Sequence, residues 1–432
     1  MRRFLVFAAS GGLLLFLIGL IALRYSPFDA QVAWRLNELR AQVKYWIAPP
    51  ERAIFIPQQN VSISPQRETQ AIPPTEAKGS STPEHKLESP TPTLVPVQTP
   101  TPSPTPTSLP AQIELRGVRH EYQTWNNCGP ATLAMALSFW GWDGDQKQVA
   151  AFTKPNPRDK NVMPYEMVNY VETQTGFGIF SRSGGDLDLL KSFLAAGFPV
   201  IVEKGFEEVS FEGWMGHYEL LTGYDDQAEN FTAQDSYMGP DIKVPYAQVE
   251  SQWRAFNNTY LVVFPLEKKS EAESLLGPQA DLAVSNQKAA DQALEDVENF
   301  SGRDLFFAWF NSGTSLVAIQ DYAGAAAAFD QAFSLYPDIP ETERPWRMLW
   351  YQTGPYWAYF YSERYQDVIN LATKTLENMS EPVLEESFYW RGMAREATGD
   401  PFGARSDFQS AIEVHPGFEP ALQQLQRLKG VP

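Results

Sequence analysis

A tract rich in proline, threonine and serine divides this chain and limits what can fold on either side of it. The tract spans residues 60–110 and ends in alternating threonine, serine and proline. It offers too little apolar surface to build a core, and proline favours an extended polyproline conformation. We therefore expect a disordered linker, rising roughly 3 Å per residue where it is stiff.

The N-terminal segment before the linker is strongly apolar. Phe4 to Leu23 is an almost uninterrupted apolar run, and roughly twenty such residues suffice to span a hydrocarbon core of about 30 Å. Ile21-Ala22-Leu23 lacks the small residues of a signal-peptide cleavage site. We expect residues 1–24 to be an uncleaved transmembrane signal anchor. With the stalk-like linker, this anchor favours a single-pass membrane protein whose later domains are extracytoplasmic.

Residues 25–59, between the anchor and the linker, carry apolar side chains at helical spacing. This pattern predicts a juxtamembrane helix. Such a helix could lie on the membrane surface, associate with a second copy or simply be exposed.

Charge and cysteine content exclude several kinds of partner. A formal net charge of -18 argues against binding to nucleic acid, whose phosphates would be repelled, so we expect protein partners. One cysteine and four histidines are too few for a disulfide framework or a four-ligand structural zinc site. Asp143-Gly144-Asp145 has no glutamate that would close a calcium loop. No cofactor and no metal are expected.

The single cysteine, Cys128, precedes an apolar run that predicts a helix. Gly129 and Pro130 open the run, its spacing buries one helical face, and Gly141 ends it. The thiol would then lie at the helix N-terminus, where unpaired amides and the helix dipole stabilise a thiolate. The alternative for a lone cysteine is a small, inert core residue.

Three further side chains complete a possible catalytic group. His217 begins an apolar stretch that reads as a strand, and an imidazole held there could exchange a proton with the thiol. Asp235 lies on the expected partner strand of the hairpin, where its carboxylate could orient the imidazole. Gln123 could donate a hydrogen bond to an oxyanion, together with the Cys128 amide. His120 precedes the expected core and ranks behind His217.

The segment from residue 113 to 266 resembles a papain-like cysteine peptidase of family thirty-nine, the bacteriocin-processing type. The resemblance is carried by the string Gln123 to Pro130, by Gly216-His217-Tyr218, by Asp235, and by the passage Leu190 to Val202. It implies an α+β fold in which Cys128 lies on a central helix packed on an antiparallel sheet that bears His217 and Asp235. It also implies cleavage of a peptide bond. No glycine-rich phosphate loop with lysine occurs in the chain.

The C-terminal third is expected to be helical. Residues 267–301 are polar and charged, which is typical of a helical connector. Residues 302–430 resemble tetratricopeptide (TPR) repeats, in which small residues let two helices approach and large ones fill between them. The repeat positions are Trp309, Gly313, Tyr322, Ala325, Phe329, Ala332 and Pro337, then Phe388, Gly392, Gly399, Ala404, Phe408, Ala411 and Pro416. A degraded copy lies between them, giving the three helix pairs that a stable stack requires.

These observations predict a membrane-anchored, extracytoplasmic cysteine peptidase with a Cys-His-Asp triad and a TPR module that recruits a protein. Two alternatives stay open at this point. One is a non-catalytic surface adaptor that binds a peptide and a protein, and the other is a thiol acyltransferase or transpeptidase built on the same residues.

Overall fold

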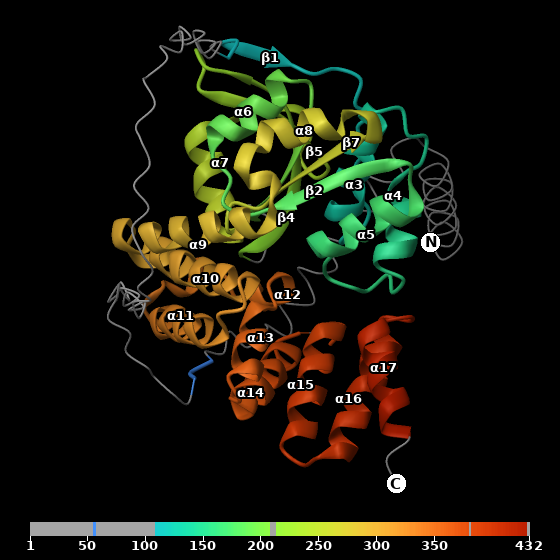
Figure 1. Cartoon of the computed structure of the whole chain (residues 1–432), viewed down its shortest axis with the longest axis vertical. Coiled ribbons are helices and arrows are strands. Elements are labelled where there is room, and N and C mark those ends of the chain that lie inside the picture. Colours follow the sequence, from blue (N-terminus) through green and yellow to red (C-terminus); the bar gives the residue numbers. More distant parts are fainter. Residues whose placement is uncertain (1–54, 58–108, 208–212, 380–381, 430–432) are drawn as a thin grey trace, which may run out of the picture.

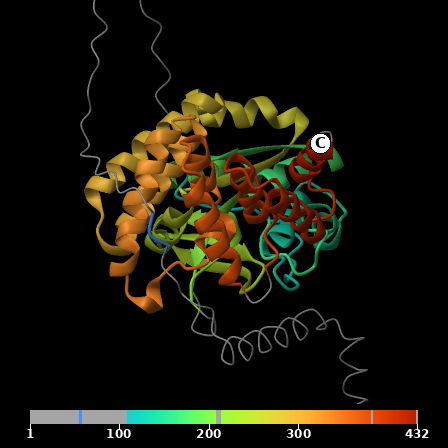
Figure 2. The same cartoon turned by 90° about the horizontal axis from the view of Figure 1, so that it is seen from below.

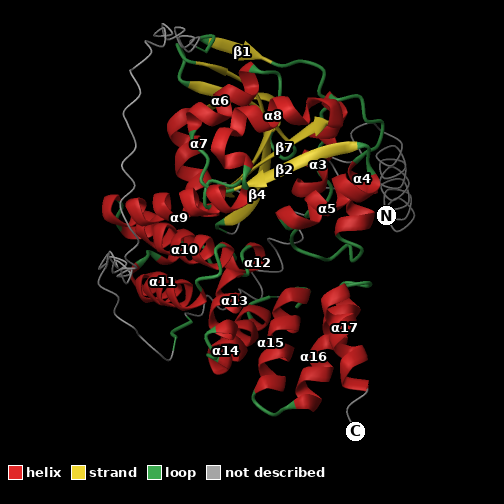
Figure 3. Cartoon of the chain, viewed as in Figure 1, coloured by secondary structure: helices red, strands yellow, loops and turns green. Residues whose placement is uncertain are grey.

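The computed structural model describes residues 55–57, 109–207, 213–379 and 382–429. The described chain has two parts, an upper part in which a sheet is surrounded by helices and a lower part that is entirely helical (Figures 1 and 3). This arrangement agrees with the expected α+β domain followed by helical repeats. The predicted anchor (residues 1–24), almost all of the predicted juxtamembrane helix (residues 25–59) and nearly all of the linker lie outside the described residues.

The upper part is built on a seven-stranded antiparallel sheet in the order β2-β7-β3-β4-β5-β6, with β1 paired to β4. Its strands are β1 (Gln112–Glu114), β2 (Phe177–Arg182), β3 (Val200–Phe206), β4 (Met215–Asp225), β5 (Asn230–Asp235), β6 (Gly239–Pro245) and β7 (Tyr260–Pro265). The hairpin predicted from the sequence is present, because β4 pairs with β5 and Asp225 faces Asn230 at its turn.

Helices cover both faces of this sheet. On one face lie α3 (Cys128–Phe139), α4 (Gln146–Thr153) and α5 (Pro164–Gln174), and on the other lie α6 (Leu187–Ala195), α7 (Tyr246–Trp253) and α8 (Lys269–Leu276). Alternate residues of a strand point to opposite faces, so Ile201 joins the first core whereas Val200 and Val202 join the second. This double burial explains why stretches such as Val200 to Val202 and Leu261 to Val263 are apolar without alternation.

Helix α3 begins at Cys128, where the sequence predicted its start, and ends at Phe139. Gly141 follows with φ of 86°, a left-handed conformation that glycine adopts without steric cost. In one respect the prediction was wrong. We expected one buried face, but every residue from Gly129 to Ser138 is buried, because α4 and α5 pack on this helix in addition to the sheet.

The predicted connector, residues 267–301, is helical, but its first helix belongs to the upper part. Ala272 and Leu276 of α8 pack in the same core as the sheet. The second helix, α9 (Leu282–Asn299), then packs along α10 (Gly302–Ala318). The boundary between the two parts therefore lies after α8.

The lower part consists of antiparallel helix pairs that lie across one end of the sheet-containing part (Figure 2). The pairs are α10 with α11 (Tyr322–Leu335), α13 (Gly354–Tyr361) with α14 (Tyr365–Glu377), and α15 (Glu385–Ala397) with α16 (Pro401–Val414). The short α12 (Met348–Tyr351) precedes α13, and α17 (Glu419–Lys429) follows α16. The middle pair is the copy that the sequence showed only in degraded form.

Small residues bring the paired helices together. A Cβ atom on Gly313 would lie 2.7 Å from the ring of Phe329, and one on Gly392 would lie 2.8 Å from the ring of Phe408. The same contact thus recurs in the first and last pairs. Most aromatic residues of the middle region fill the interior, whereas Trp357 and Tyr361 are 39% and 50% exposed.

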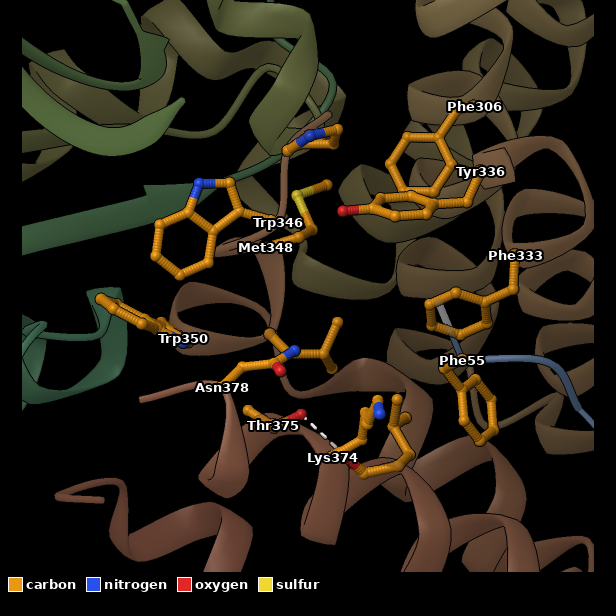
Figure 4. A pocket seen from close by; sticks show the side chains of 13 residues that line it. Phe55, Phe306, Phe333, Tyr336, Trp346, Met348, Trp350, Lys374, Thr375 and Asn378 are labelled. Carbon is orange, nitrogen blue, oxygen red and sulfur yellow. Dashed lines mark hydrogen bonds between the residues drawn. The ribbon is translucent and has the colours of Figure 1, made fainter. Parts of the chain in front are cut away.

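One residue from the N-terminal side of the linker packs into the repeats. The ring of Phe55 is buried at 5.1 Å from that of Phe333 and 6.1 Å from that of Tyr359. It lies at the edge of a cavity of about 50 Å³ that Trp346 and Asn378 also line (Figure 4). Residues 55–57 are not helical. Within the described ranges, no helix combines the length and apolar character that crossing a bilayer requires.

Candidate active site

Cys128 is the first residue of α3 and keeps part of its surface exposed. The preceding residue, Asn127, makes no side-chain hydrogen bond to cap the helix. The amide groups of the first turn are therefore not taken up by a cap, and the positive end of the helix dipole acts on the sulfur. This is the position that the sequence predicted, and it favours a thiolate.

The structure brings His217 and Asp235 together beside this thiol. His217 lies on β4 and Asp235 at the end of β5, and Nε2 of His217 lies 3.0 Å from Oδ2 of Asp235. A second hydrogen bond joins the His217 ring to Cys128. Because Nε2 is engaged by Asp235, Nδ1 is the ring nitrogen that faces the sulfur.

Asp235 and His217 are both held rigidly. Oδ1 of Asp235 accepts hydrogen bonds from the backbone amides of Tyr237 and Met238, at 2.7 and 2.9 Å. The ring of Phe206 stacks on the imidazole of His217 with centroids 4.8 Å apart. These contacts fix the carboxylate and the ring plane in one orientation, which is what a proton relay needs.

The electrostatics of the group favour an ion pair. Burial alone would raise the pKa of Cys128, but the hydrogen bond and charge of His217, the backbone of Tyr218 and the charge of Lys154 lower it below its usual value. Burial would lower the pKa of His217, yet Asp235 and the thiolate raise it to about 10. The imidazolium in turn holds the pKa of Asp235 well below its usual range. The arrangement therefore stabilises thiolate, imidazolium and carboxylate together.

Gln123 is tied to the residue that follows Asp235. Its backbone amide donates to the carbonyl of Ser236 and its Oε1 accepts from Oγ of Ser236, both at 2.9 Å. The side-chain NH₂ group of Gln123 remains as a hydrogen-bond donor. This contact links the position of Gln123 to the hairpin that carries His217 and Asp235.

The other histidine of this region contacts the same aspartate in a different way. Nε2 of His120 lies 3.1 Å from the backbone carbonyl oxygen of Asp235, and its ring packs edge-on against Tyr122. His120 thus supports the backbone of the hairpin, and His217 is the histidine that engages the thiol.

Two buried charged residues near the thiol were not predicted from the sequence. Nζ of Lys154 donates to the carbonyls of Asn126 and Asp159, at 2.9 and 3.1 Å, and its charge acts on Cys128. Burial lowers the pKa of Lys154 to about 8. Glu203 on β3 is buried, and burial, together with the charge of Cys128, raises the pKa of its carboxyl to about 8.

Neither residue belongs to a motif. The only available signal for Glu203 was that Glu203 and Lys204 follow directly on the aliphatic run Val200 to Val202, in a strand that is otherwise apolar. Lys204 forms a buried ion pair with Glu219, with 2.9 Å between Nζ and Oε1. For Lys154, which follows what reads as an ordinary surface helix, the sequence gives no sign that the side chain is buried.

Among the described residues, one group could hold a metal ion. Ligand atoms of Asp159, Glu385 and His415 lie within 4.8 Å of one another. Nδ1 of His415 and Oε1 of Glu385 are 2.6 Å apart and already satisfy each other. The group joins the two parts of the molecule, since Asp159 precedes α5 whereas Glu385 and His415 belong to the last helix pair.

Comparison with known proteins agrees with this division. Residues 115–261 match the model of the peptidase C39-like family, and residues 307–338 and 386–417 match tetratricopeptide repeats. The chain therefore carries a peptidase C39-like domain followed by TPR repeats. The middle helix pair, α13 and α14, lies between the two matched repeats. A search of curated proteins found no match.

Solved structures resemble about a third of the chain. A putative C39-like peptidase from Bacillus anthracis is 18% identical and covers 35% of this chain and 96% of its own (TM-score 0.30). The peptidase domain of Streptococcus ComA, a bi-functional ABC transporter, is 17% identical and covers 34% and 98% (TM-score 0.28). Xylellain, a cysteine protease from Xylella fastidiosa, is 15% identical and covers 37% and 87% (TM-score 0.29).

Proposed function

We propose that this protein is a cysteine peptidase that cleaves a peptide bond with Cys128, His217 and Asp235. The observation that supports it most directly is the hydrogen-bonded series from the thiol through the imidazole to a buried carboxylate. A lowered thiol pKa combined with a raised imidazole pKa is typical of a nucleophile that is already ionised at neutral pH.

In the proposed reaction, the Cys128 thiolate attacks the substrate carbonyl carbon and a carbon–sulfur bond forms. The Cys128 backbone amide and the Gln123 side chain donate hydrogen bonds to the oxyanion. The His217 imidazolium gives its proton to the amine as the carbon–nitrogen bond breaks. Neutral His217 then takes a proton from water, the hydroxide attacks the acyl-enzyme, and the thiolate leaves.

The proposal includes a location and a recruiting module. Residues 1–24 would anchor the protein in the membrane as a single pass, the linker would hold the peptidase domain away from the bilayer, and the TPR repeats would bind a protein partner or substrate. The apolar N-terminal run and the proline-rich tract support an extracytoplasmic placement. Adding a protease to intact cells should cleave the linker, whereas cleavage only after lysis would refute this placement.

Labelling of Cys128 by iodoacetamide at pH 7 tests the active site. The wild-type chain should react rapidly, and His217→Ala should react at least about tenfold more slowly because the thiol loses the charge that ionises it. His120→Ala is the matched control, since it removes an imidazole that engages Asp235 through the backbone carbonyl and not through the carboxylate. Equal rates for wild type and His217→Ala would favour the non-catalytic adaptor.

A second measurement separates hydrolysis from acyl transfer. If labelling depends on His217, the products formed from a peptide library with and without an added amine should be identified by mass spectrometry. Free carboxyl ends are expected from a peptidase. Products in which the amine replaces water as the acceptor would identify an acyltransferase or transpeptidase.

A further inference from the structure

A cavity of about 560 Å³ lies between the peptidase-like domain and the last helix pairs. One wall comes from α4 and α5, with Phe152 and Tyr165. The other comes from α13, α15 and the loop between α16 and α17, with Trp357, Trp390 and Phe418. These elements face one another in Figure 1, where α5 lies above α15 to α17. A cavity of this size has room for a short stretch of peptide.

Three aromatic side chains at this cavity are exposed. Tyr165 is 56% exposed, Trp357 is 39% exposed and Phe152 is 36% exposed. The rings of Trp357 and Trp390 lie against each other with centroids 4.7 Å apart. Open aromatic faces of this kind bind aliphatic stems and attract cations.

The charges of the lining have one sign. Glu166, Glu386 and Glu419 line the cavity, and no lysine or arginine of the described residues does so. His415, which also lines it, already pairs with Glu385. The buried Lys154 behind the wall is committed to the backbone carbonyls of Asn126 and Asp159. Carboxylates therefore outnumber the positive charges available to neutralise them.

Two of these carboxylates lie in positions where a cation would be favoured. Glu386 is 8% exposed, and its Oε1 accepts a hydrogen bond of 3.0 Å from the hydroxyl of Tyr165. Glu166 lines the opposite wall, where its Oε2 accepts a hydrogen bond of 2.7 Å from the backbone amide of Met163. A positive group between the two walls would pair with both carboxyl groups.

We propose that this cavity binds the side chain of a lysine or arginine carried by a peptide or protein. Carboxylates at the wall would pair with the ammonium or guanidinium group, and the open aromatic rings would cover its aliphatic stem. An anionic or purely apolar ligand would leave the carboxylates without a partner. The inference concerns binding alone and does not require peptidase activity.

The cavity is nevertheless connected to the candidate active site. Glu166, in the first turn of α5, is part of its wall. In the loop just before α5, the carbonyl of Val162 accepts a hydrogen bond of 2.9 Å from the hydroxyl of Tyr218, the residue after His217. Lys154 joins the same loop, through Asp159, to Asn126 near the thiol. A polypeptide bound here by a basic residue would therefore lie next to the elements that support Cys128.

Calorimetric titration of the full chain carrying Cys128→Ala, which prevents cleavage, tests the binding. The probes are three capped tripeptides with alanine on each side of a central arginine, lysine or citrulline. Citrulline has nearly the shape of arginine but no charge. At least one basic peptide should bind about tenfold or more tightly than the citrulline peptide, as expected for one charge-assisted contact. Equal affinities, or no binding by any of the three, would overturn the proposal.

Substitutions then locate the site. Glu386→Gln and Glu166→Gln should each weaken the basic peptide about tenfold, whereas Glu377→Gln, which changes an exposed glutamate of α14, should not. Trp357→Ala changes an exposed ring of the aromatic wall and should also weaken binding of the basic peptide. It tests the same site if a glutamine variant fails to fold. Unchanged binding in Glu386→Gln and Trp357→Ala counts against the proposal. A second contrary outcome is that zinc chloride displaces the peptide from the wild-type chain but not from His415→Ala. This result would identify a metal site.

Discussion

The thiol of Cys128 is held between groups that oppose one another. Burial disfavours a thiolate, whereas His217, the backbone of Tyr218 and Lys154 favour it. The balance falls on the side of the thiolate because the imidazole acts at hydrogen-bond distance and is itself charged by Asp235. The ionisation of this thiol therefore depends on a group two hydrogen bonds away from the sulfur.

Lys154→Met should make the thiol less acidic. Burial lowers the pKa of Lys154 only to about 8, so the lysine is charged at neutral pH and its loss removes an attraction for the thiolate. We expect the pH at which iodoacetamide labelling is half-maximal to rise by about half a unit, since Lys154 is the smallest of the contributions. Lys147→Met, at an exposed position of α4, is the control. An unchanged midpoint would show that Lys154 acts only on the loop.

Glu203→Gln should change how stability depends on pH. The pKa of Glu203 rises from an ordinary 4.5 to about 8 on folding, so the folded chain binds this proton more tightly than the unfolded chain does. Its contribution is fully present below about pH 4.5 and is lost as the pH rises through about 8. Urea unfolding of wild type should show the free energy of unfolding falling over this window, and Glu203→Gln should flatten the fall. An identical slope in both would contradict the assignment.

At the scale of single elements, the sequence predicted the helix and the hairpin on which the candidate site residues lie. Glycine and proline after Cys128 and glycine at 141 marked both ends of α3, since these residues have positional preferences that act locally. Alternating apolar residues and a turn marked the β4–β5 hairpin. Antiparallel pairing of neighbouring strands then brought His217 and Asp235 to one end of the sheet.

Other features depend on residues far apart in the chain and left no local pattern. Lys154 is buried only because its ammonium group reaches carbonyls of two separate loops. Glu203 lies near Cys128 because β3 pairs with β4, a register that no short window of sequence encodes. The complete burial of α3 has the same origin, since α4 and α5 pack on the sides that do not face the sheet.

Gly392→Val should destabilise the last helix pair. A Cβ atom there would lie 2.8 Å from the ring of Phe408 and 3.2 Å from the carbonyl oxygen of Ala404, so α15 and α16 would have to separate. We expect a loss of about 1–3 kcal/mol in the free energy of unfolding, measured by circular dichroism during urea titration. Ala397→Val, at the exposed end of the same helix, should cost less than about 0.5 kcal/mol. Comparable losses in both variants would contradict the close approach.

At the scale of the whole molecule, the repeats and the peptidase-like domain share a packed joint. Trp214, which precedes β4, stacks on Phe256 with centroids 5.6 Å apart and meets Tyr351 of the repeats edge-on. A Cβ atom on Gly216 would lie 2.8 Å from the Tyr351 ring. Because Gly216 immediately precedes His217, glycine here lets the repeats pack directly beside the strand that bears the imidazole.

Trp214→Ala tests whether this joint makes the two parts one cooperative unit. The indole is 2% exposed, and truncating a buried tryptophan typically costs about 3–5 kcal/mol through the cavity that remains. We expect calorimetry of the full chain to show one unfolding transition for wild type and two for Trp214→Ala, because the repeats would no longer be held to β4. Iodoacetamide labelling of Cys128 should also slow as His217 loses its support.

Tyr361→Ala, at an exposed ring of the repeats, should leave both measurements unchanged. A single transition with unchanged labelling in Trp214→Ala would mean that the two parts are held together by other contacts, such as the ion pair between Arg254 and Asp304.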